Sequence, residues 1–357
     1  MKKILFYLPS LAPAGGIERV TSTLMNKLAK YYDITVLTKD SRASFYSLHT
    51  NIKHISLEAH VGLNMKNRLS RAFALGLNLL KTIIKLKKTS LNNFDYIYIT
   101  HPLSHIELLL SNAKYSKIVI SEHGASNNYN HIYRIIKKIT YKYCHAYCIP
   151  TKNDVIYYSR ENFPVKYTPH YMPDLNYQPS PLNKKTILNI GRYTDDKKQL
   201  TLLKIWNDIS DKDKSGWHLN IVGDGELKDI LQQYIVENNL TTSVTLLPPL
   251  KNVEKYYMNS SIFALTSRSE GFGMVLLEAT GFGLPLVSFD CPSGPRDIIS
   301  DTNGFLIKMD DIHTYKMTLI RLMNNNNLLH ELSSGSLCTA KFWSDDNITK
   351  IWRDIFS

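Results

Sequence analysis

Short β-rich runs alternate with longer helical stretches along the whole chain of 357 residues, in two successive series. This alternation predicts parallel sheets covered by helices, because a parallel strand pair needs a long crossover that is usually helical. The chain is too long for one ordinary core and suits two α/β domains of roughly 150–180 residues each. The expected strands are residues 3–8, 33–38, 52–57, 95–100, 117–122 and 146–149, then 186–190, 218–222, 243–247, 261–265, 284–289 and 304–307.

A proline-rich stretch separates the two series. Residues 169–185 contain four prolines and lack hydrophobic periodicity, which is typical of an interdomain linker. We therefore expect a first doubly wound domain at 1–172, a linker at 173–185 and a second doubly wound domain at 186–342. Residues 343–357 carry apolar residues at helical spacing, and we expect them to form a helix that packs back on the first domain.

The excess positive charge lies entirely in the first half of the chain. Residues 1–180 carry 24 Lys and Arg against 10 Asp and Glu, whereas residues 181–357 carry 19 against 21. A basic surface favours anionic lipid headgroups, phosphates or nucleic acid. Basic charge alone is poor evidence for nucleic acid, and the chain shows no recognisable nucleic-acid motif, so we expect no nucleic-acid partner.

The basic stretch 66–88 has seven basic residues and no acidic ones, with apolar residues at helical spacing. Two interpretations stay open. The helix contacts an anionic membrane surface, or it packs its apolar side into the domain and leaves its lysines in water. A second basic run at 133–143 has the same character.

The chain contains no run of 18 apolar residues, so we expect no membrane-spanning helix, and the N-terminal run suits a strand better than a signal peptide. The four scattered cysteines lack a CxxC spacing and are interpreted as ordinary thiols of a reducing compartment. The expected location is therefore cytoplasmic, with peripheral contact at the inner face of the plasma membrane as the finer hypothesis.

The segment 267–287 combines a glycine-rich turn with two glutamates. Glu270 stands before the expected helix and Glu278 lies two turns along it, at most roughly 12 Å away. The free amides and dipole of a helix start suit a diphosphate. The two carboxylates could then accept hydrogen bonds from a sugar and a ribose on either side. An ordinary acidic helix start with a chance glutamate explains the spacing equally well.

The stretch EGFGMVLLEATGFGLPLVSFD at 270–290 resembles the donor-site signature of the retaining glycosyltransferase family 4, also called glycosyl transferases group 1. The resemblance implies the GT-B fold, in which two Rossmann-like doubly wound domains face each other across a cleft. It also implies that Glu270 contacts the transferred sugar and that Glu278 binds the ribose. The turn and helix start expected to meet the sugar and diphosphate are Gly271, Phe272, Gly273, Met274 and Val275.

The stretch ILNIGRYTDDKKQLTLLKIW at 187–206 also resembles the family, with Gly191 and Arg192 after a strand and a lysine five residues later. By this resemblance Arg192 and Lys197 are catalytic, because fixed cations stabilise the negative charge that collects on a departing diphosphate without a metal. Lys198 stands where relatives often have glycine, so the choice between the two lysines is open, and we prefer Lys197. Taken alone, these residues could be solvated loop charges.

The stretch IVGDGELKDIL at 221–231 resembles the family's glycine-rich turn behind the nucleotide, which makes Gly223 a donor-binding candidate. It is not the GxGxxG fingerprint of dinucleotide-binding proteins, because no third glycine follows at the required position. Hydride transfer from NAD is therefore disfavoured.

Two segments of the first half resemble the family more weakly. Gly15 and Gly16 follow the first strand and would bring backbone amides near the donor diphosphate when the cleft closes. His123 follows a later strand and, by resemblance, lies near the reacting sugar, although a lone histidine is more often structural. His101 and His105 are weaker candidates for the acceptor side.

The residues Asp211 to Asp213 spell the DxD metal motif of another glycosyltransferase fold. They lie in a polar run before a strand and lack supporting ligands, so we expect neither a metal site nor a cofactor.

By the family resemblance we expect a hexosyltransferase-type, retaining, metal-independent enzyme with a nucleoside-diphosphate sugar donor. UDP is the expected nucleotide, although the base is only weakly indicated. The first domain would hold a saccharide acceptor, and its basic charge suggests one linked to polyprenyl diphosphate, as in bacterial O-antigen, capsule, exopolysaccharide or lipopolysaccharide synthesis. The alternatives are another GT-B enzyme, such as a UDP-sugar 2-epimerase or a phosphorylase, and a non-catalytic nucleotide-sugar-binding protein.

Overall fold

The computed structural model describes residues 1–13, 15–59, 68–124, 131–250 and 252–357. The chain divides into two compact units, which are described one at a time. The first unit comprises Met1–Pro173 together with Asp345–Ser357, and the second comprises Asp174–Ser344.

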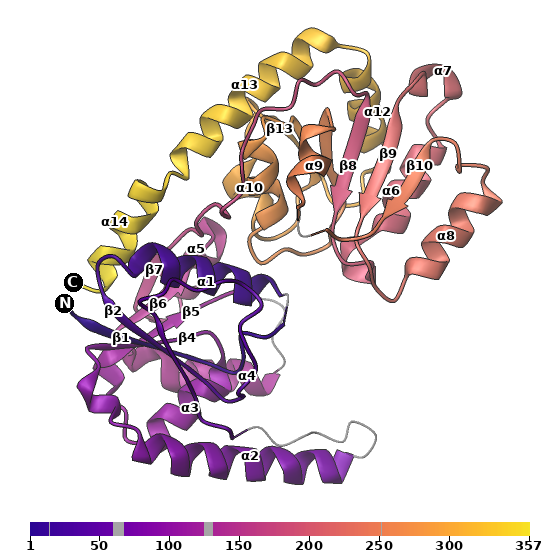
Figure 1. Ribbon diagram of the computed structural model, residues 1–357. Coiled ribbons are helices and arrows are strands. Elements are labelled where there is room, and N and C mark those ends of the chain that lie inside the picture. The colour runs from indigo at the N-terminus through magenta and orange to yellow at the C-terminus, as the bar shows by residue number, and fades with distance from the viewer. Residues whose placement is uncertain (14, 60–67, 125–130, 251) are drawn as a thin grey trace. The chain divides into compact units, whose positions relative to one another are not determined.

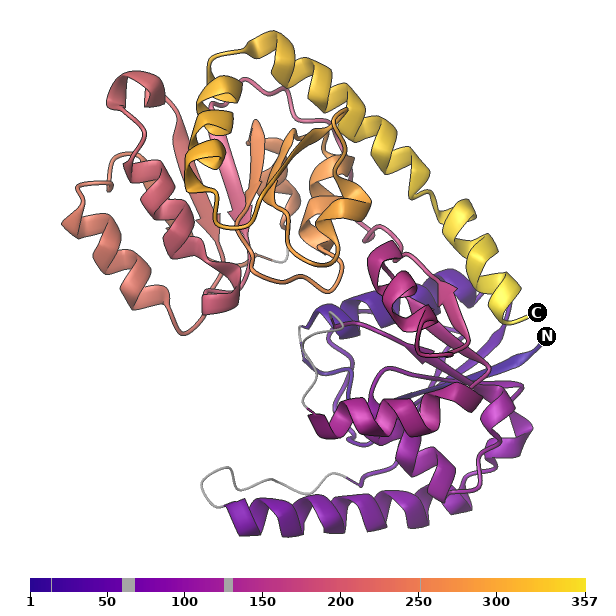
Figure 2. The same cartoon turned by 180° about the vertical axis from the view of Figure 1, so that it is seen from behind.

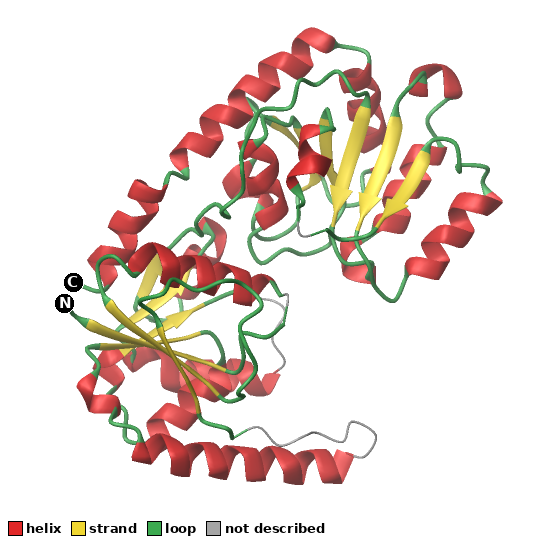
Figure 3. Cartoon of the chain, viewed as in Figure 1, coloured by secondary structure: helices red, strands yellow, loops and turns green. Residues whose placement is uncertain are grey.

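The first unit is built on a seven-stranded sheet in which every described strand pair is parallel (Figures 1 and 3). The spatial order is β3-β2-β1-β4-β5-β6-β7. The strands are β1 (Lys3–Leu8), β2 (Asp33–Thr38), β3 (Lys53–Ser56), β4 (Tyr96–Ile99), β5 (Ile118–Ser121), β6 (Ala146–Ile149) and β7 (Val165–Tyr167).

Helices cover both faces of this sheet. Helix α1 lies on one face, whereas α2, α3 and α4 form a layer on the other, with α3 packed against both α2 and α4 (Figures 1 and 2). The helices of this unit are α1 (Gly16–Leu28), α2 (Arg68–Lys88), α3 (Pro102–Leu110), α4 (His131–Thr140), α5 (Lys152–Ser159) and α14 (Asp345–Ile355).

The C-terminal helix α14 belongs to the first unit although it follows the second in sequence. Its Trp352 is 2% exposed, and Phe356 just beyond it is fully buried. The hydroxyl of Tyr171 lies 2.9 Å from that of Thr349, and Lys27 of α1 forms an ion pair of 2.8 Å with Asp345. Apolar burial and these polar contacts together fix the helix on this unit.

The second unit contains a six-stranded sheet in the order β10-β9-β8-β11-β12-β13, again parallel throughout. Its strands are β8 (Thr186–Ile190), β9 (His218–Val222), β10 (Val244–Leu247), β11 (Ile262–Leu265), β12 (Leu286–Phe289) and β13 (Gly304–Ile307). Its helices are α6 (Gln199–Asn207), α7 (Asp211–Lys214), α8 (Lys228–Glu237), α9 (Glu254–Met258), α10 (Met274–Gly281), α11 (Pro295–Ile298), α12 (Ile312–Met323) and α13 (Asn326–Phe342).

Both sheets reverse their winding direction beside their first strand, between β1 and β4 in the first unit and between β8 and β11 in the second. Doubly wound sheets bind ligands outside the carboxyl ends of the strands at this reversal. The predicted fold class, two doubly wound parallel α/β domains, is confirmed. The edge strand β7 is an element that the sequence did not lead us to expect.

Candidate functional site

The loops that follow β8 and β11 meet at the reversal point of the second sheet. The loop after β8 leads through Asp195–Lys197 into α6, and the loop after β11 leads to Glu270. The amide of Arg268 donates to the carbonyl of Asp196 at 2.8 Å, and the Thr266 hydroxyl donates to the carbonyls of Lys197 and Lys198 at 3.1 Å. These bonds fix the two loops against each other.

An ion pair between Lys197 and Glu270 lies at this junction. Lys197 Nζ is 2.6 Å from Glu270 Oε1, and Glu270 is only 8% exposed. The neighbouring Lys198 points elsewhere, because its Nζ lies 2.5 Å from the exposed carboxylate of Asp310. Lys197 is therefore the lysine that the backbone directs toward Glu270.

The side chains of Lys197 and Lys198 point in different directions because of the backbone conformation of Lys198. It adopts the left-handed conformation, with φ of 50°, and caps the N-terminus of α6. This conformation is easy for glycine and costs other residues free energy. It lets consecutive lysines send their side chains to different partners.

Arg192 stands at the start of the same loop and is exposed. Its guanidinium makes no hydrogen bond or ion pair with any residue that the structure describes. Its carbonyl, by contrast, accepts a hydrogen bond of 2.9 Å from Gln199 Nε2, so the backbone is anchored. Arg192 and Lys197 thus place two cations at the reversal point, one unpaired within the described chain and one paired with Glu270.

The turn before α10 depends on two glycines. Gly273 caps the helix with φ of 88°, a left-handed conformation that other residues seldom adopt. A Cβ on Gly294 would lie 2.2 Å from the carbonyl oxygen of Phe272, so only glycine allows this segment to pack against the turn. The first amides of α10, at Met274 and Val275, have no acceptor within the helix by geometry and are available to an anion.

Glu278 lies on the buried side of α10 and is 1% exposed. The hydroxyl of Tyr257 donates to its Oε2 at 2.8 Å. The Tyr257 ring is itself held by stacking on Phe282, with centroids 5.0 Å apart and planes 4° apart. Tyr257 is therefore a support for Glu278, and nothing in the sequence pointed to it.

Gly191 directly follows β8, and Gly223 directly follows β9. A Cβ on Gly223 would lie 2.0 Å from the carbonyl oxygen of Gly191, so contact between adjacent strands requires this glycine. A Cβ on Gly191 would meet nothing closer than 3.5 Å. Packing thus accounts for Gly223 without any ligand, whereas Gly191 is not required by the protein's own packing.

Gly15, Gly16 and His123 belong to the first unit, whereas the other predicted site residues belong to the second. Gly15 caps α1 after β1, and a Cβ on Gly16 would meet nothing within 4 Å. His123 follows β5. These three therefore lie near the carboxyl ends of the strands of their own sheet.

The His123 ring packs between two other side chains. It stacks on His170 with centroids 5.4 Å apart and planes 14° apart, and its Nε2 lies 3.4 Å from the Tyr98 hydroxyl. Desolvation lowers the pKa of His123 to about 4, and the nearby carboxylate of Glu122 opposes this shift only in part. At neutral pH the ring is therefore uncharged and can offer a hydrogen bond without repelling a cation.

The two weaker histidine candidates lie at the start of α3 and within it. His101 caps α3, its Nδ1 accepting from the amide of Leu103 at 3.2 Å. His105 is completely buried, and its Nδ1 lies 3.1 Å from the Thr140 hydroxyl. The expectation that His105 lines an acceptor site is wrong, because its position on α3 turns it toward α4.

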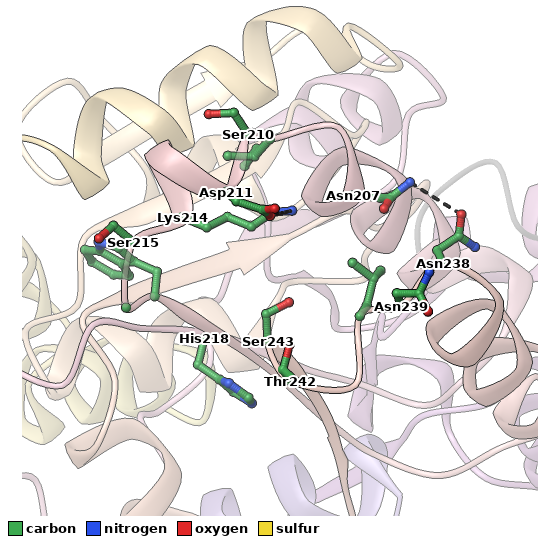
Figure 4. A pocket seen from close by; sticks show the side chains of 14 residues that line it. Asn207, Ser210, Asp211, Lys214, Ser215, His218, Asn238, Asn239, Thr242 and Ser243 are labelled. Carbon is green, nitrogen blue, oxygen red and sulfur yellow. Dashed lines mark hydrogen bonds and ion pairs between the residues drawn. The ribbon is translucent and has the colours of Figure 1, made fainter.

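A cavity of about 680 Å³, whose lining includes His218 and Ser243 (Figure 4), lies at the amino ends of β9 and β10. This is the opposite end of the sheet from the Lys197–Glu270 pair. Asp211 of the DxD run lines it, whereas Asp213 accepts a hydrogen bond of 2.6 Å from the Ser210 hydroxyl. The run therefore serves the start of the short helix α7. Among the described residues, no three His, Cys, Asp or Glu side chains are grouped to hold a metal ion.

Comparison with known proteins shows what the chain is similar to. Residues 175–336, which lie within the second unit, match the family model described as Glycosyl transferases group 1. Over its full length the chain is 28% identical to the amylovoran biosynthesis glycosyltransferase AmsD of Erwinia amylovora, covering 100% of both chains.

A second relative, from Campylobacter jejuni, is 26% identical and covers 100% of this chain and 99% of its own. It is named GalNAc-alpha-(1->4)-GalNAc-alpha-(1->3)-diNAcBac-PP-undecaprenol alpha-1,4-N-acetyl-D-galactosaminyltransferase. The structure of a point mutant of Staphylococcus aureus TarM in complex with fondaparinux, alpha-GlcNAc-glycerol and UDP superimposes with a TM-score of 0.81 at 14% identity, covering 100% of both chains. This likeness confirms the GT-B fold.

Proposed function

We propose that the chain is a retaining glycosyltransferase that moves a hexose from a UDP-sugar to a saccharide acceptor. The observation that carries the proposal is the group of Arg192, Lys197 and Glu270 at the reversal point of a Glycosyl transferases group 1 domain. Support comes from the two relatives, whose names describe glycosyltransferases, and from the UDP bound to TarM.

In this proposal the second unit binds the donor. The free amides at the start of α10 receive the diphosphate, Glu278 binds the ribose and Glu270 accepts hydrogen bonds from the sugar. As the glycosidic bond breaks, negative charge collects on the departing diphosphate, and Arg192 and Lys197 stabilise it. These two cations perform the task for which other enzymes use a metal, so the reaction proceeds without one.

Retention of configuration follows if the acceptor hydroxyl attacks from the face that the diphosphate leaves. The departing phosphate oxygen then takes the proton of the hydroxyl, and no protein base is needed. Glu270 positions the sugar and compensates charge through its pair with Lys197. In this proposal Gly15 and Gly16 of the first unit offer backbone amides to the donor diphosphate, and the neutral ring of His123 donates to or accepts from the sugar.

The acceptor in this proposal is a saccharide linked to polyprenyl diphosphate, held by the first unit at the inner face of the plasma membrane. The outer surface of the α2–α4 layer supports it. Leu80 and Ile84 of α2 are 59% and 57% exposed, and Ile135 and Ile139 of α4 are 45% and 64% exposed. Exposed apolar side chains among lysines and arginines suit the interface of an anionic bilayer. No helix among the described residues is long and apolar enough to cross a membrane.

Changing Ile84 or Ile139 to glutamate should weaken binding to vesicles that contain anionic lipid by at least about tenfold. Each change removes an apolar side chain from the lipid interface and adds a charge of the repelled sign. Vesicle sedimentation at low salt measures the affinity. The matched control is Ile230→Glu on α8 of the second unit, which is 49% exposed and should leave vesicle binding unchanged. Equal losses in the three variants would remove the support for this surface.

The test of the proposed function is donor binding followed by thermal unfolding. UDP at about 100 times its Kd should stabilise the protein by about 2.7 kcal/mol and raise the unfolding temperature of the second unit by roughly 5–10 °C. The shift should persist in EDTA and shrink in Arg192→Ala. No shift with UDP-, GDP-, ADP- or TDP-linked sugars would overturn the donor site, and formation of an epimer without acceptor would instead show a 2-epimerase.

A further inference from the structure

Helix α4 buries a lysine while it exposes two isoleucines. Lys137 is 3% exposed, whereas Ile135 and Ile139, two positions before and after it, are 45% and 64% exposed. An isoleucine would fill an interior position at lower cost, because a buried ammonium loses its hydration and must be compensated by a partner. The inward position of Lys137 is therefore explained by what it contacts.

The partner of Lys137 is Glu122, the first residue after β5 and itself 3% exposed. Lys137 Nζ and the hydroxyl of Tyr147 both donate to Glu122 Oε2. The same ammonium lies 3.1 Å from the Tyr147 hydroxyl and 3.4 Å from that of Tyr158. One carboxylate oxygen is thus held by donors from α4 and β6.

The other oxygen of Glu122 holds the turn that carries His123. Glu122 Oε1 accepts hydrogen bonds from the amide of His123 at 3.0 Å and from that of Gly124 at 3.1 Å. These are successive amides beyond the end of β5, where the sheet no longer supplies partners. The carboxylate therefore joins the turn after β5 to α4 and β6 through its two oxygens.

We propose that Glu122, anchored by Lys137 and Tyr147, is a positioning residue that fixes the backbone of the His123 turn and thereby the place of the His123 ring. The proposal rests on the proposed role of His123 in sugar transfer. The ring's other contacts, the Tyr98 hydroxyl at 3.4 Å and the stacked His170, limit its rotation but do not hold the backbone from which it projects. Glu122 supplies that missing constraint.

The test compares two double variants that both remove the buried charges. In Glu122→Gln/Lys137→Met the amide oxygen can still accept from the two backbone amides. In Glu122→Met/Lys137→Met no acceptor remains. Both variants remove the Lys137–Glu122 ion pair as a whole, so neither leaves one of these two charges buried without the other, and both are expected to fold. Tyr147→Phe, which removes one donor to Glu122 and keeps the ring, is a third and milder variant.

Imidazole NMR of His123, assigned by loss of its signal in His123→Ala, reports the ring directly. In the wild type and in Glu122→Gln/Lys137→Met the ring should stay neutral down to about pH 5. In Glu122→Met/Lys137→Met its signal should shift and titrate closer to the ordinary histidine value of about 6.5, because the loosened turn lets water reach the ring. Tyr147→Phe should give a smaller shift in the same direction.

Kinetics supply the second readout. We expect kcat of Glu122→Met/Lys137→Met to fall about 10–100-fold relative to Glu122→Gln/Lys137→Met, with the KM for the donor unchanged because the second unit binds it. An unmoved His123 signal in Glu122→Met/Lys137→Met would overturn the positioning role. A moved signal with unchanged kcat would support positioning by Glu122 and instead refute the role of His123 in the reaction.

Discussion

Replacing Lys197 by alanine should lower kcat by about 10²–10³-fold, the loss typical of removing one fixed group that stabilises charge in a transition state. The physical reason is the position of its Nζ, 2.6 Å from Glu270 at the reversal point of the second sheet. In the proposed reaction this ammonium faces the diphosphate as it takes up negative charge. Transfer from a UDP-sugar to acceptor, followed at saturating donor, measures the loss.

Lys198→Ala is the matched control, since it removes the same group one residue along the chain. The Lys198 partner is the carboxylate of Asp310, which is 61% exposed, and such surface pairs contribute only about 0–1 kcal/mol. We expect kcat to change by less than about twofold. A large loss in Lys198→Ala with little loss in Lys197→Ala would show that the assignment of the two lysines is inverted.

The strands were the most predictable part of the fold. Parallel strands buried on both faces appear as short continuous apolar runs, and β1, β4 and β5 lie within the ranges expected or overlap them closely. Strand β7 was missed because it spans only Val165–Tyr167, between Pro164 and Pro169, too short for any pattern. Pairing with β6 at the sheet edge, rather than local preference, makes it a strand.

The sequence could not predict which of Lys197 and Lys198 points toward Glu270. Both lysines are consecutive and chemically identical, so their spacing from Arg192 cannot decide which one points inward. The left-handed backbone of Lys198 decides it, and that conformation depends on the start of α6 and on the Thr266 hydroxyl that holds the loop. Such backbone detail is a tertiary property.

The Glu122–Lys137 ion pair could not be predicted from the sequence, for a related reason. The run 133–143 has four basic residues and no acidic one, and the domain-helix interpretation places its lysines in water. For Lys137 that interpretation is wrong, since this side chain turns inward to a carboxylate 15 residues earlier in the chain. Helical periodicity could not reveal the burial of Lys137. Ile135 and Ile139, two positions before and after Lys137, are the residues that a helical pattern would have placed in the core.

Replacing Gly294 by alanine should destabilise the second unit by about 2–5 kcal/mol, as expected for a strained backbone combined with overpacking. Gly294 has φ of 88° and ψ of −69°, and the added Cβ would lie 2.2 Å from the carbonyl oxygen and 2.5 Å from the carbonyl carbon of Phe272. Both atoms are backbone, so the turn before α10 must shift and UDP binding should weaken with it.

Gly16→Ala is the control on stability, because its Cβ meets nothing within 4 Å and its α1 backbone suits alanine. Urea unfolding followed by tryptophan fluorescence compares the two variants, and equal midpoints would show that the packing of Gly294 on Phe272 does not hold the turn.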